Sequence, residues 1–540
     1  MRVDVIDTPE GLAGLREEWE HIFAADPEAQ HFLSHGWISR YLAKRRRWFV
    51  LALRPSEGAP AIALFPLRMQ SRQDADGRFF DEIIMAGNYA ADYTGFIALP
   101  AIAEIAARAF AAWLCRQNWT QIKFDYLGGS AARTVALLGA MEGPGVKFRR
   151  NAPRNEQNID NTICPYIALP DTFEAYLENH LSSQTRQKMR RFLRKLDGVE
   201  YRITRATPET IERDLDILFN FWRIRWTPVK GEEKTEKLIV MSRRMLEDCF
   251  TDGDLDVPVL WAGERPLGAL ANILDRKKKL VLFYITGRDE EWKLPPPGLM
   301  LHGDAIRKAI AEGYRVYDFL RGNEPYKYAF GVEERRISCV LTKRESGRKA
   351  GIPLHPWSIR PVYEQALGFY HKGRKTEAEI AFSQILEVQP AHGGAAFGFA
   401  NLQFEKRDFA KAESIYRALL QRGEPPVPIL SRLGDLLIAT RRFDEAAETY
   451  ADICCVSPEN TEARYKQGVA LLADGEREKA AAAFSIAADN KSGLPEHAYH
   501  ADKAKKALAR LIFSQAKAPA PPVFPRDFHG LADGVRPVLH

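Results

Sequence analysis

The sequence predicts an α/β part with mixed sheets, followed by an all-α repeat solenoid. Two observations lead to this fold class. In the first 345 residues, short apolar strand patterns alternate with helical patterns, as expected for an α/β fold. Behind them, small and aromatic residues recur every 34 residues, a period typical of paired-helix repeats. The chain of 540 residues is too long for one hydrophobic core, so several domains are expected.

The composition is that of an ordinary globular protein, with 46% hydrophobic and 27% charged residues. The N-terminus lacks the apolar stretch of a signal peptide, and no uncharged apolar run is long enough to span a bilayer. None of the six cysteines forms a CxxC pair, so we expect free thiols in the cytoplasm and no metal site. The net charge of +6 fits an anionic ligand but does not indicate DNA binding.

Residues 1–155 are expected to form the first α/β segment. WFVLALR (48–54) and PAIALFPLRMQ (60–70) predict a β-hairpin. The alanine-rich stretch 101–117 predicts a helix, and QIKFDYL (121–127) predicts another strand.

Residues 156–345 repeat this style. Helical patterns cover 171–196 and 207–226, a hairpin is predicted over 257–274, and a last strand over 336–344.

Within that second segment lies a predicted βαβ unit. Its strands are 279–287 and 315–320, and its helix is 299–313. The two strands should be parallel with a right-handed crossover. Because an antiparallel hairpin precedes this unit, the predicted sheet is mixed.

The 34-residue period follows small and aromatic positions that keep one register, namely Ala378, Ala412, Ala446 and Ala480, and Phe382, Tyr416, Tyr450 and Phe484. They resemble four tetratricopeptide repeats, in which the small residues let paired helices approach closely. With a capping helix, this domain is predicted over 359–515. A linker is predicted over 346–358, and a Pro/Ala-rich disordered tail over 516–540. The repeats are expected to present a groove to a partner protein, or else only to stabilise or dimerise the chain.

The stretch LPPPGLMLHGDAIRKAIAEGYRVYDFLRGNEPYKYAFG (294–331) resembles GNAT acyltransferases of the CelD-like and Fem-type group. Further matches are FLSHGW (32–37), ADYTG (91–95) and FWRIRW (221–226). The resemblance covers about residues 1–345. It implies two GNAT-like folds in tandem, the second of them catalytic.

This resemblance implies transfer of an acyl group from an acyl-CoA co-substrate. Backbone N–H groups of Gly298, Leu299 and Met300, at the start of the predicted helix, would bind its phosphates with help from the helix dipole. The prolines at 295–297 replace the Gly-rich loop of ordinary acetyl-CoA-binding members and remove N–H donors. Fem-type members use an aminoacyl-tRNA instead, and we rank that donor below acyl-CoA.

Four residues are predicted to carry the chemistry. Asp318 would accept the proton of the amine. Lys327, at the lysine position of the Fem-type YK motif, would stabilise developing negative charge. Tyr284 would donate to the leaving thiolate, and Glu324 would act beside Arg321, which is assigned to the co-substrate. The alternative interpretations are a strand-end ion pair for Asp318, a surface lysine for Lys327 and a core tyrosine for Tyr284. Glu324 and Arg321 would, in the alternative, only hold the loop.

Two further groups complete the predicted site. Arg186 and Arg190 lie four residues apart on the basic stretch 182–196 and suit a phosphate, although a solvated face is an equal alternative. The residues assigned to the acceptor are Asp92, Tyr93, Arg223, Trp226 and Tyr326.

The sequence therefore predicts a cytoplasmic N-acyltransferase acting on a sugar, an amino acid or an envelope or exopolysaccharide precursor, docked to a partner through its repeats. One alternative is an inactive scaffold that works through the repeats. The other is an aminoacyl-tRNA-dependent transferase.

Overall fold

A computed structural model of the chain describes residues 1–88, 90–345, 352–489 and 495–514. The predicted tail and residues 346–351 of the predicted linker lie outside these ranges. The chain divides into two compact units. Unit 1 is residues 1–70 with 81–352, and unit 2 is residues 71–80 with 353–540.

The first sheet of unit 1 is mixed and has the strand order β1-β2-β3-β4-β6-β16-β7, with β5 paired to β3. Strands β4 and β6 are parallel, whereas β16 is antiparallel to both β6 and β7. The last predicted strand therefore lies in the first sheet, although it follows the second segment in sequence. The bounds are β1 (Arg2–Ile6), β2 (Trp48–Arg54), β3 (Ala63–Gln73), β4 (Phe79–Met85), β5 (Ile97–Ala98), β6 (Gln121–Leu127), β7 (Val146–Asn151) and β16 (Ser338–Arg344).

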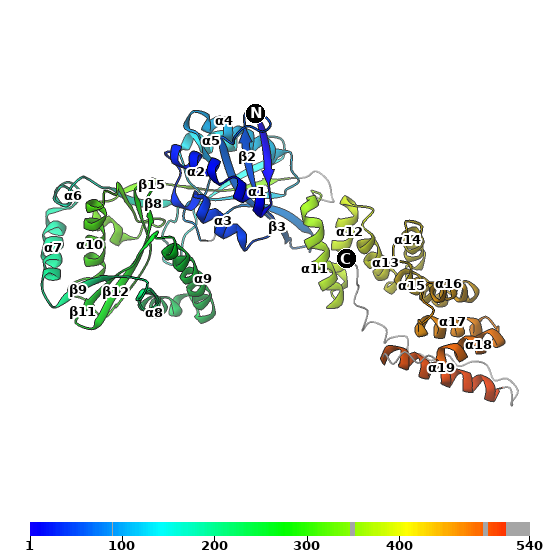
Figure 1. The fold of residues 1–540 in the computed structure, drawn as a ribbon. Coiled ribbons are helices and arrows are strands. Elements are labelled where there is room, and N and C mark those ends of the chain that lie inside the picture. Colours follow the sequence, from blue (N-terminus) through cyan, green and yellow to red (C-terminus); the bar gives the residue numbers. More distant parts are fainter. Residues whose placement is uncertain (89, 346–351, 490–494, 515–540) are drawn as a thin grey trace. The chain divides into compact units, whose positions relative to one another are not determined.

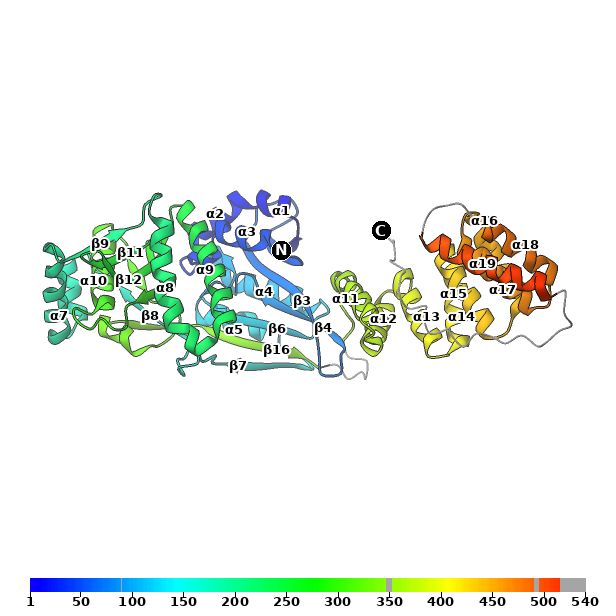
Figure 2. The same cartoon turned by 90° about the horizontal axis from the view of Figure 1, so that it is seen from below.

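Helices cover both faces of this sheet (Figure 2). On one face, α4 (Ala103–Cys115) packs through aromatic rings, with centroids 5.6 Å apart for Phe49 and Trp113 and 5.5 Å for Phe65 and Phe110. The alternate strand residues Val50 and Ala52 share a buried cluster with Leu12, Trp19 and Ile38 of three other helices, because successive side chains of a strand point to opposite faces. The remaining helices are α1 (Pro9–Gly14), α2 (Arg16–Ala25), α3 (His35–Ala43) and α5 (Ala131–Gly139).

The second sheet has the order β15-β8-β14-β13-β12-β11-β9, with β10 paired to β12. Strands β13 and β14 are parallel, and the other pairs described in this sheet are antiparallel. This confirms the predicted βαβ unit and the mixed sheet. The bounds are β8 (Ile163–Ala168), β9 (Tyr201–Arg205), β10 (Leu255–Asp256), β11 (Pro258–Ala262), β12 (Arg265–Asp275), β13 (Leu280–Arg288), β14 (Val316–Asp318) and β15 (Glu333–Arg336).

The second sheet lies between two helical layers (Figure 1). The layer of α8 (Ile211–Lys230) and α9 (Glu232–Thr251) covers one face, and α10 (Pro297–Ala311), with α7 (Ser183–Leu193) behind it, covers the other. The prediction of one helix over 171–196 is wrong, because α6 (Phe173–His180) ends before Ser182. The Ser182 hydroxyl accepts a hydrogen bond from the Thr185 N–H and starts α7 there.

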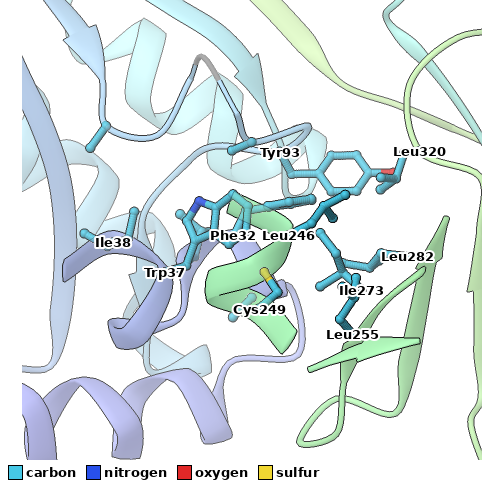
Figure 3. Packing of buried hydrophobic residues seen from close by; sticks show 14 of the residues in the cluster. Phe32, Trp37, Ile38, Tyr93, Leu246, Cys249, Leu255, Ile273, Leu282 and Leu320 are labelled. Carbon is cyan, nitrogen blue, oxygen red and sulfur yellow. The ribbon is translucent and has the colours of Figure 1, made fainter. Parts of the chain in front are cut away.

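One apolar cluster joins the two sheets of unit 1 (Figure 3). It brings Phe32, Trp37 and Tyr93 from the first 155 residues against Leu246 of α9 and Leu320, which follows β14. The two halves therefore share a core, and a loop from the first half lies beside the end of β14.

Unit 2 is a run of helix pairs, which confirms the predicted solenoid. The periodic residues predicted to pack are buried, and Gly434 lies so close to the Tyr450 ring that a Cβ there would be 2.6 Å from Cζ. The helices are α11 (Ile359–His371), α12 (Lys375–Val388), α13 (Gly393–Glu405), α14 (Phe409–Gln421), α15 (Pro426–Ala439), α16 (Phe443–Val456), α17 (Thr461–Ala473), α18 (Arg477–Ala488) and α19 (Pro495–Ser514).

No helix in the described part of the chain combines the length and apolar character needed to cross a membrane.

Candidate active site

Unit 1 contains a cavity of about 630 Å³ where two parallel strands part. Strands β13 and β14 pair from Leu280 with Val316 to Leu282 with Asp318. Beyond these pairs, residues 283–288 of β13 line one side of the cavity and residues 319–321 line another. A ligand in this space can reach backbone groups that the sheet leaves unpaired.

The chain leaves β14 through a tight turn. Leu320 has a φ of 58° and Gly322 a φ of 103°, which is the region that favours glycine. A Cβ on Gly322 would lie 2.6 Å from a carboxylate oxygen of Glu324. The turn delivers the short helix η4 (Pro325–Phe330) to the cavity.

Lys327 lines the cavity but is almost fully buried. Its Nζ donates to the carbonyl oxygens of Phe319 at 2.9 Å, Arg321 at 3.0 Å and Gly322 at 3.0 Å, and it lies 2.9 Å from Glu324 Oε2. An ammonium has three hydrogens, so the turn itself occupies its donors.

Asp318 is buried behind the cavity and is not among the residues that line it. Tyr93 Oη donates to Oδ1 at 2.9 Å, the Leu320 N–H donates to Oδ1 at 2.8 Å, and Arg335 lies 3.3 Å from Oδ2. Burial raises the pKa of the Asp318 carboxyl, while Arg335 opposes this. The carboxylate thus links the end of β14 to the loop that carries Tyr93.

A second link joins the same two segments. Arg321 donates to Asp92 Oδ1 at 2.6 Å, and its guanidinium lies 3.7 Å from the centroid of the Tyr126 ring. Tyr284, on β13, donates its hydroxyl hydrogen to the Ala90 carbonyl at 2.9 Å. The loop around residues 90–93 therefore closes one side of the cavity, and the hydroxyl assigned to the thiolate is already bonded to it.

Helix α8 forms an aromatic wall. Trp222 and Trp226 line the cavity with ring centroids 6.0 Å apart. The helix lies close to β13 at Gly287, where a Cβ would contact the Leu218 carbonyl and the Phe221 side chain. Arg223 instead pairs with Glu236 on α9 and is not among the lining residues.

The N-terminus of α10 opens into the cavity. Gly298 and Leu299 line it, and their N–H groups have no hydrogen-bond partner in the part of the chain that the structure describes. The Met300 N–H donates to the Pro296 carbonyl at 3.3 Å. Arg288 also lines the cavity, and its guanidinium would lie 3.6 Å from a Cβ on Gly298. These donors and this cation suit an anionic group.

The predicted residues thus divide into two groups. Those that line the cavity are Asp92, Trp226, Tyr284, Gly298, Leu299, Arg321, Glu324, Tyr326 and Lys327. Those that do not are Tyr93, Arg186, Arg190, Arg223, Met300 and Asp318. Arg190 is exposed and pairs with Glu174 on α6.

The lining residues that the sequence reasoning did not assign include Trp222, Arg225, Arg288 and His302. His302 lies on α10, with its ring centroid 4.5 Å from Phe283, 5.0 Å from Phe330 and 5.2 Å from Phe319. The signal available was a single histidine within the apolar run LMLHGDAI. A search that considers only histidines at metal-ligand spacing does not find such a residue.

Among the described residues, no group of three or more His, Cys, Asp or Glu side chains is arranged to hold a metal ion.

Family models match one segment in unit 1 and two segments in unit 2. Residues 183–328 match the family model described as an acetyltransferase (GNAT) domain, and residues 363–425 and 431–495 match that of the tetratricopeptide repeat. The chain therefore carries a GNAT-type acetyltransferase domain. It combines this domain with tetratricopeptide repeats, as the resemblance implied.

Solved structures are only distantly similar. FemX is 11% identical, with 64% of this chain and 97% of that chain covered and a TM-score of 0.43. A conserved protein of unknown function from Bacteroides thetaiotaomicron is 12% identical, with 64% and 100% covered and a TM-score of 0.40. YrrB, a TPR protein with an unusual peptide-binding site, is 19% identical, with 28% and 79% covered and a TM-score of 0.24. Similarities at these TM-scores carry no information about function. No curated protein matches the chain.

Proposed function

We propose that the protein transfers an acyl group from an acyl-CoA to an amine of a sugar, an amino acid or an envelope or exopolysaccharide precursor. The observation that carries this proposal is the cavity between the parting strands β13 and β14, inside the segment that matches an acetyltransferase domain. Its volume of about 630 Å³ is in the range of small-molecule sites.

The N-terminus of α10 is our proposed site for the phosphates of the donor. The free N–H groups of Gly298 and Leu299 are supported by the positive end of the helix dipole and by Arg288. The first turn of α10 contains no acidic residue, although Glu290 lines the cavity and pairs with Arg288 at 3.2 Å, so a phosphate would compete with this carboxylate for Arg288. The three prolines lack N–H groups, so the N–H groups of Gly298 and Leu299 are the two donors left for a phosphate.

The wall of α8 is our proposed site for the acceptor. The two indole rings of Trp222 and Trp226 offer flat apolar surfaces with polar edges, which suits the face of a sugar ring. Arg225 lines the cavity beside them and has no ion-pair partner among the described residues. It would favour an acceptor with a carboxylate or phosphate group.

We further propose that the tetratricopeptide repeats bind a partner protein and that the protein acts in the cytoplasm, where its six unpaired cysteines would stay reduced. We also propose that the domains divide after residues 155, 345 and 358.

Titration calorimetry of the full-length protein with acetyl-CoA tests the donor assignment. Arg288→Gln should weaken binding about tenfold, the effect of one lost charged contact. Arg190→Gln should leave it unchanged if the phosphates lie at α10, and should weaken it if they lie at α7. Release of free thiol from acetyl-CoA in the presence of amino sugars and amino acids then tests transfer.

The scaffold alternative is favoured by one observation, because the fold itself occupies both Lys327 and Asp318. It predicts a folded protein that binds no acyl-CoA of any chain length. The aminoacyl-tRNA alternative predicts tRNA binding that weakens steeply with salt. That binding would be lost when the basic residues of α7 are neutralised.

A further inference from the structure

His302 presents one nitrogen to the fold and the other to the cavity. Its Nδ1 lies 3.0 Å from Tyr317 Oη. Nε2 has no hydrogen-bond partner among the described residues. The atom keeps some accessible surface, because the described polar atoms that are fully buried without a partner do not include it. Since His302 lines the cavity and is otherwise buried, Nε2 is reached from the cavity.

The partners of Nδ1 set the tautomer. Tyr317 Oη donates to Asn272 Oδ1 at 3.4 Å. A phenol has one hydrogen. An Asn272 amide turned to donate through Nδ2, which has no partner in the described residues, would leave that hydrogen for His302. With Asn272 Oδ1 facing Tyr317, Tyr317 instead accepts the hydrogen carried by His302 Nδ1. In this arrangement Nε2 carries a lone pair, and the tautomer follows from the network of bonded groups.

The surroundings keep the imidazole neutral and fixed. Rings of β13, η4 and the chain after β14 surround it. Burial, and then the charges of Lys327 and Arg288, lower its pKa to about 3. The other titratable groups that face it are the phenols of Tyr317 and Tyr326. His302 is therefore unprotonated near neutral pH and a weak base, so it can hold a proton only transiently, as the proton passes from the acceptor to the leaving group.

The carboxylates that line the cavity are already paired. Each acidic side chain among the described lining residues forms an ion pair: Asp92 with Arg321, Glu290 with Arg288, and Glu324 with Lys327. The nitrogen–oxygen distances are 2.6, 3.2 and 2.9 Å, respectively. A proton from a substrate would compete with these cations at each carboxylate. Nε2 of His302 forms no ion pair, although the charges of Lys327 and Arg288 also disfavour a proton on the ring.

We propose that His302 is a catalytic residue of the transferase, whose Nε2 accepts the proton that the acceptor amine must lose. This inference rests on the acyl transfer proposed above. The amine nitrogen forms a bond to the thioester carbonyl carbon, and the carbon–sulfur bond breaks. The proton passes from the nitrogen to Nε2 and then to the leaving thiolate, so that an amide, a free thiol and a neutral imidazole result. Tyr317 and Asn272 are positioning residues that hold Nδ1 protonated.

The first test is His302→Gln in the full-length protein, assayed as thiol release from acetyl-CoA with a primary amine acceptor. We expect kcat/KM to fall about 100-fold, in the range of a lost general base, with acetyl-CoA binding by calorimetry unchanged. Hydroxylamine is largely unprotonated at neutral pH and depends less on a base, so its turnover should fall much less. The matched control is His35→Gln, a buried histidine of unit 1 bonded to the Leu12 carbonyl, which should leave kcat/KM unchanged.

The second test reads the tautomer directly. In ¹⁵N-histidine spectra the wild-type His302 should show the Nδ1–H form. Tyr317→Phe should convert the signal to a mixture and lower kcat/KM with the ring still in place. A wild-type Nε2–H form, or His302→Gln turnover within a fewfold of wild type, would overturn the role of His302 and leave the transferase standing. A wild-type protein that neither binds nor turns over any acyl-CoA would overturn both proposals.

Discussion

The hydroxyl of Tyr93 donates a hydrogen bond to Asp318 Oδ1 at 2.9 Å and lies 3.0 Å from Oδ2, across 225 positions of sequence. Both residues are buried, and the Tyr93 ring packs near Leu320 in the shared core (Figure 3). This bond fixes a loop of the first half of unit 1 to the strand end that borders the cavity.

Tyr93→Phe should therefore destabilise unit 1 by about 1–3 kcal/mol, because Asp318 loses a donor while it stays buried. Tryptophan fluorescence during urea unfolding measures this, since every tryptophan except Trp357 precedes residue 353. Tyr166→Phe, which removes an exposed bond to Glu333, is the control and should change stability by less than about 0.5 kcal/mol. Equal effects of the two substitutions would contradict the proposed link.

Lys327→Met should unfold unit 1 more easily by about 3–5 kcal/mol, because Glu324 and three carbonyl oxygens lose their partner. The same urea titration measures this. Combining it with Glu324→Gln should cost less than the sum of the two single changes, since the pair is coupled. Lys147→Met, at an exposed ion pair with Glu345, is the control. Loss of turnover at unchanged stability would instead indicate a purely chemical role for Lys327.

The stability of unit 1 should decrease as the pH falls from about 6.5 toward 4. Burial lowers the pKa of His302 to about 3 and that of His31 to about 4. Between these values and the ordinary histidine pKa of about 6.5, the unfolded chain binds protons that the folded chain does not. Each histidine then costs up to about 1.4 kcal/mol per pH unit.

Replacing either residue by Gln should flatten this pH dependence, measured by urea unfolding at several pH values. The exposed His21→Gln variant should keep the wild-type slope. Wild-type slopes in all three variants would show that neither buried histidine stays neutral in the folded protein.

Gly434→Ala should destabilise unit 2 by about 1–3 kcal/mol, because the new methyl group would meet the Tyr450 ring. Amide hydrogen exchange in the helices of unit 2 measures this stability separately from that of unit 1, which also contains helices. Gly368→Ala on α11, where a Cβ meets nothing within 4 Å, should instead stabilise it by up to about 1 kcal/mol. Stability changes of opposite sign at these two glycines would support close packing between α15 and α16. Changes of the same sign would contradict it.

Local patterns predicted most of the elements. The 34-residue register located the repeats, and the strand, helix and strand over 279–320 gave the parallel pair of β13 and β14. Boundaries were less accurate, since the break at Ser182 depends on one capping bond within a continuous helical pattern.

For the site, the sequence indicated the region after β14, and Arg321, Glu324, Tyr326 and Lys327 do line one cavity. It did not indicate that Lys327 would be buried by the turn it follows. Nor did it indicate His302, because an apolar helix face does not reveal which cavity it borders.

The sequence by itself determined the order of elements, the parallel strand pair and the repeat register, because each depends on periodicity within a few tens of residues. Only the tertiary structure decided that β16 joins the first sheet, that Tyr93 bonds Asp318 and that His302 has one nitrogen open to the cavity. These features join residues far apart in the chain. They are fixed by burial and hydrogen-bond partners that no local pattern encodes.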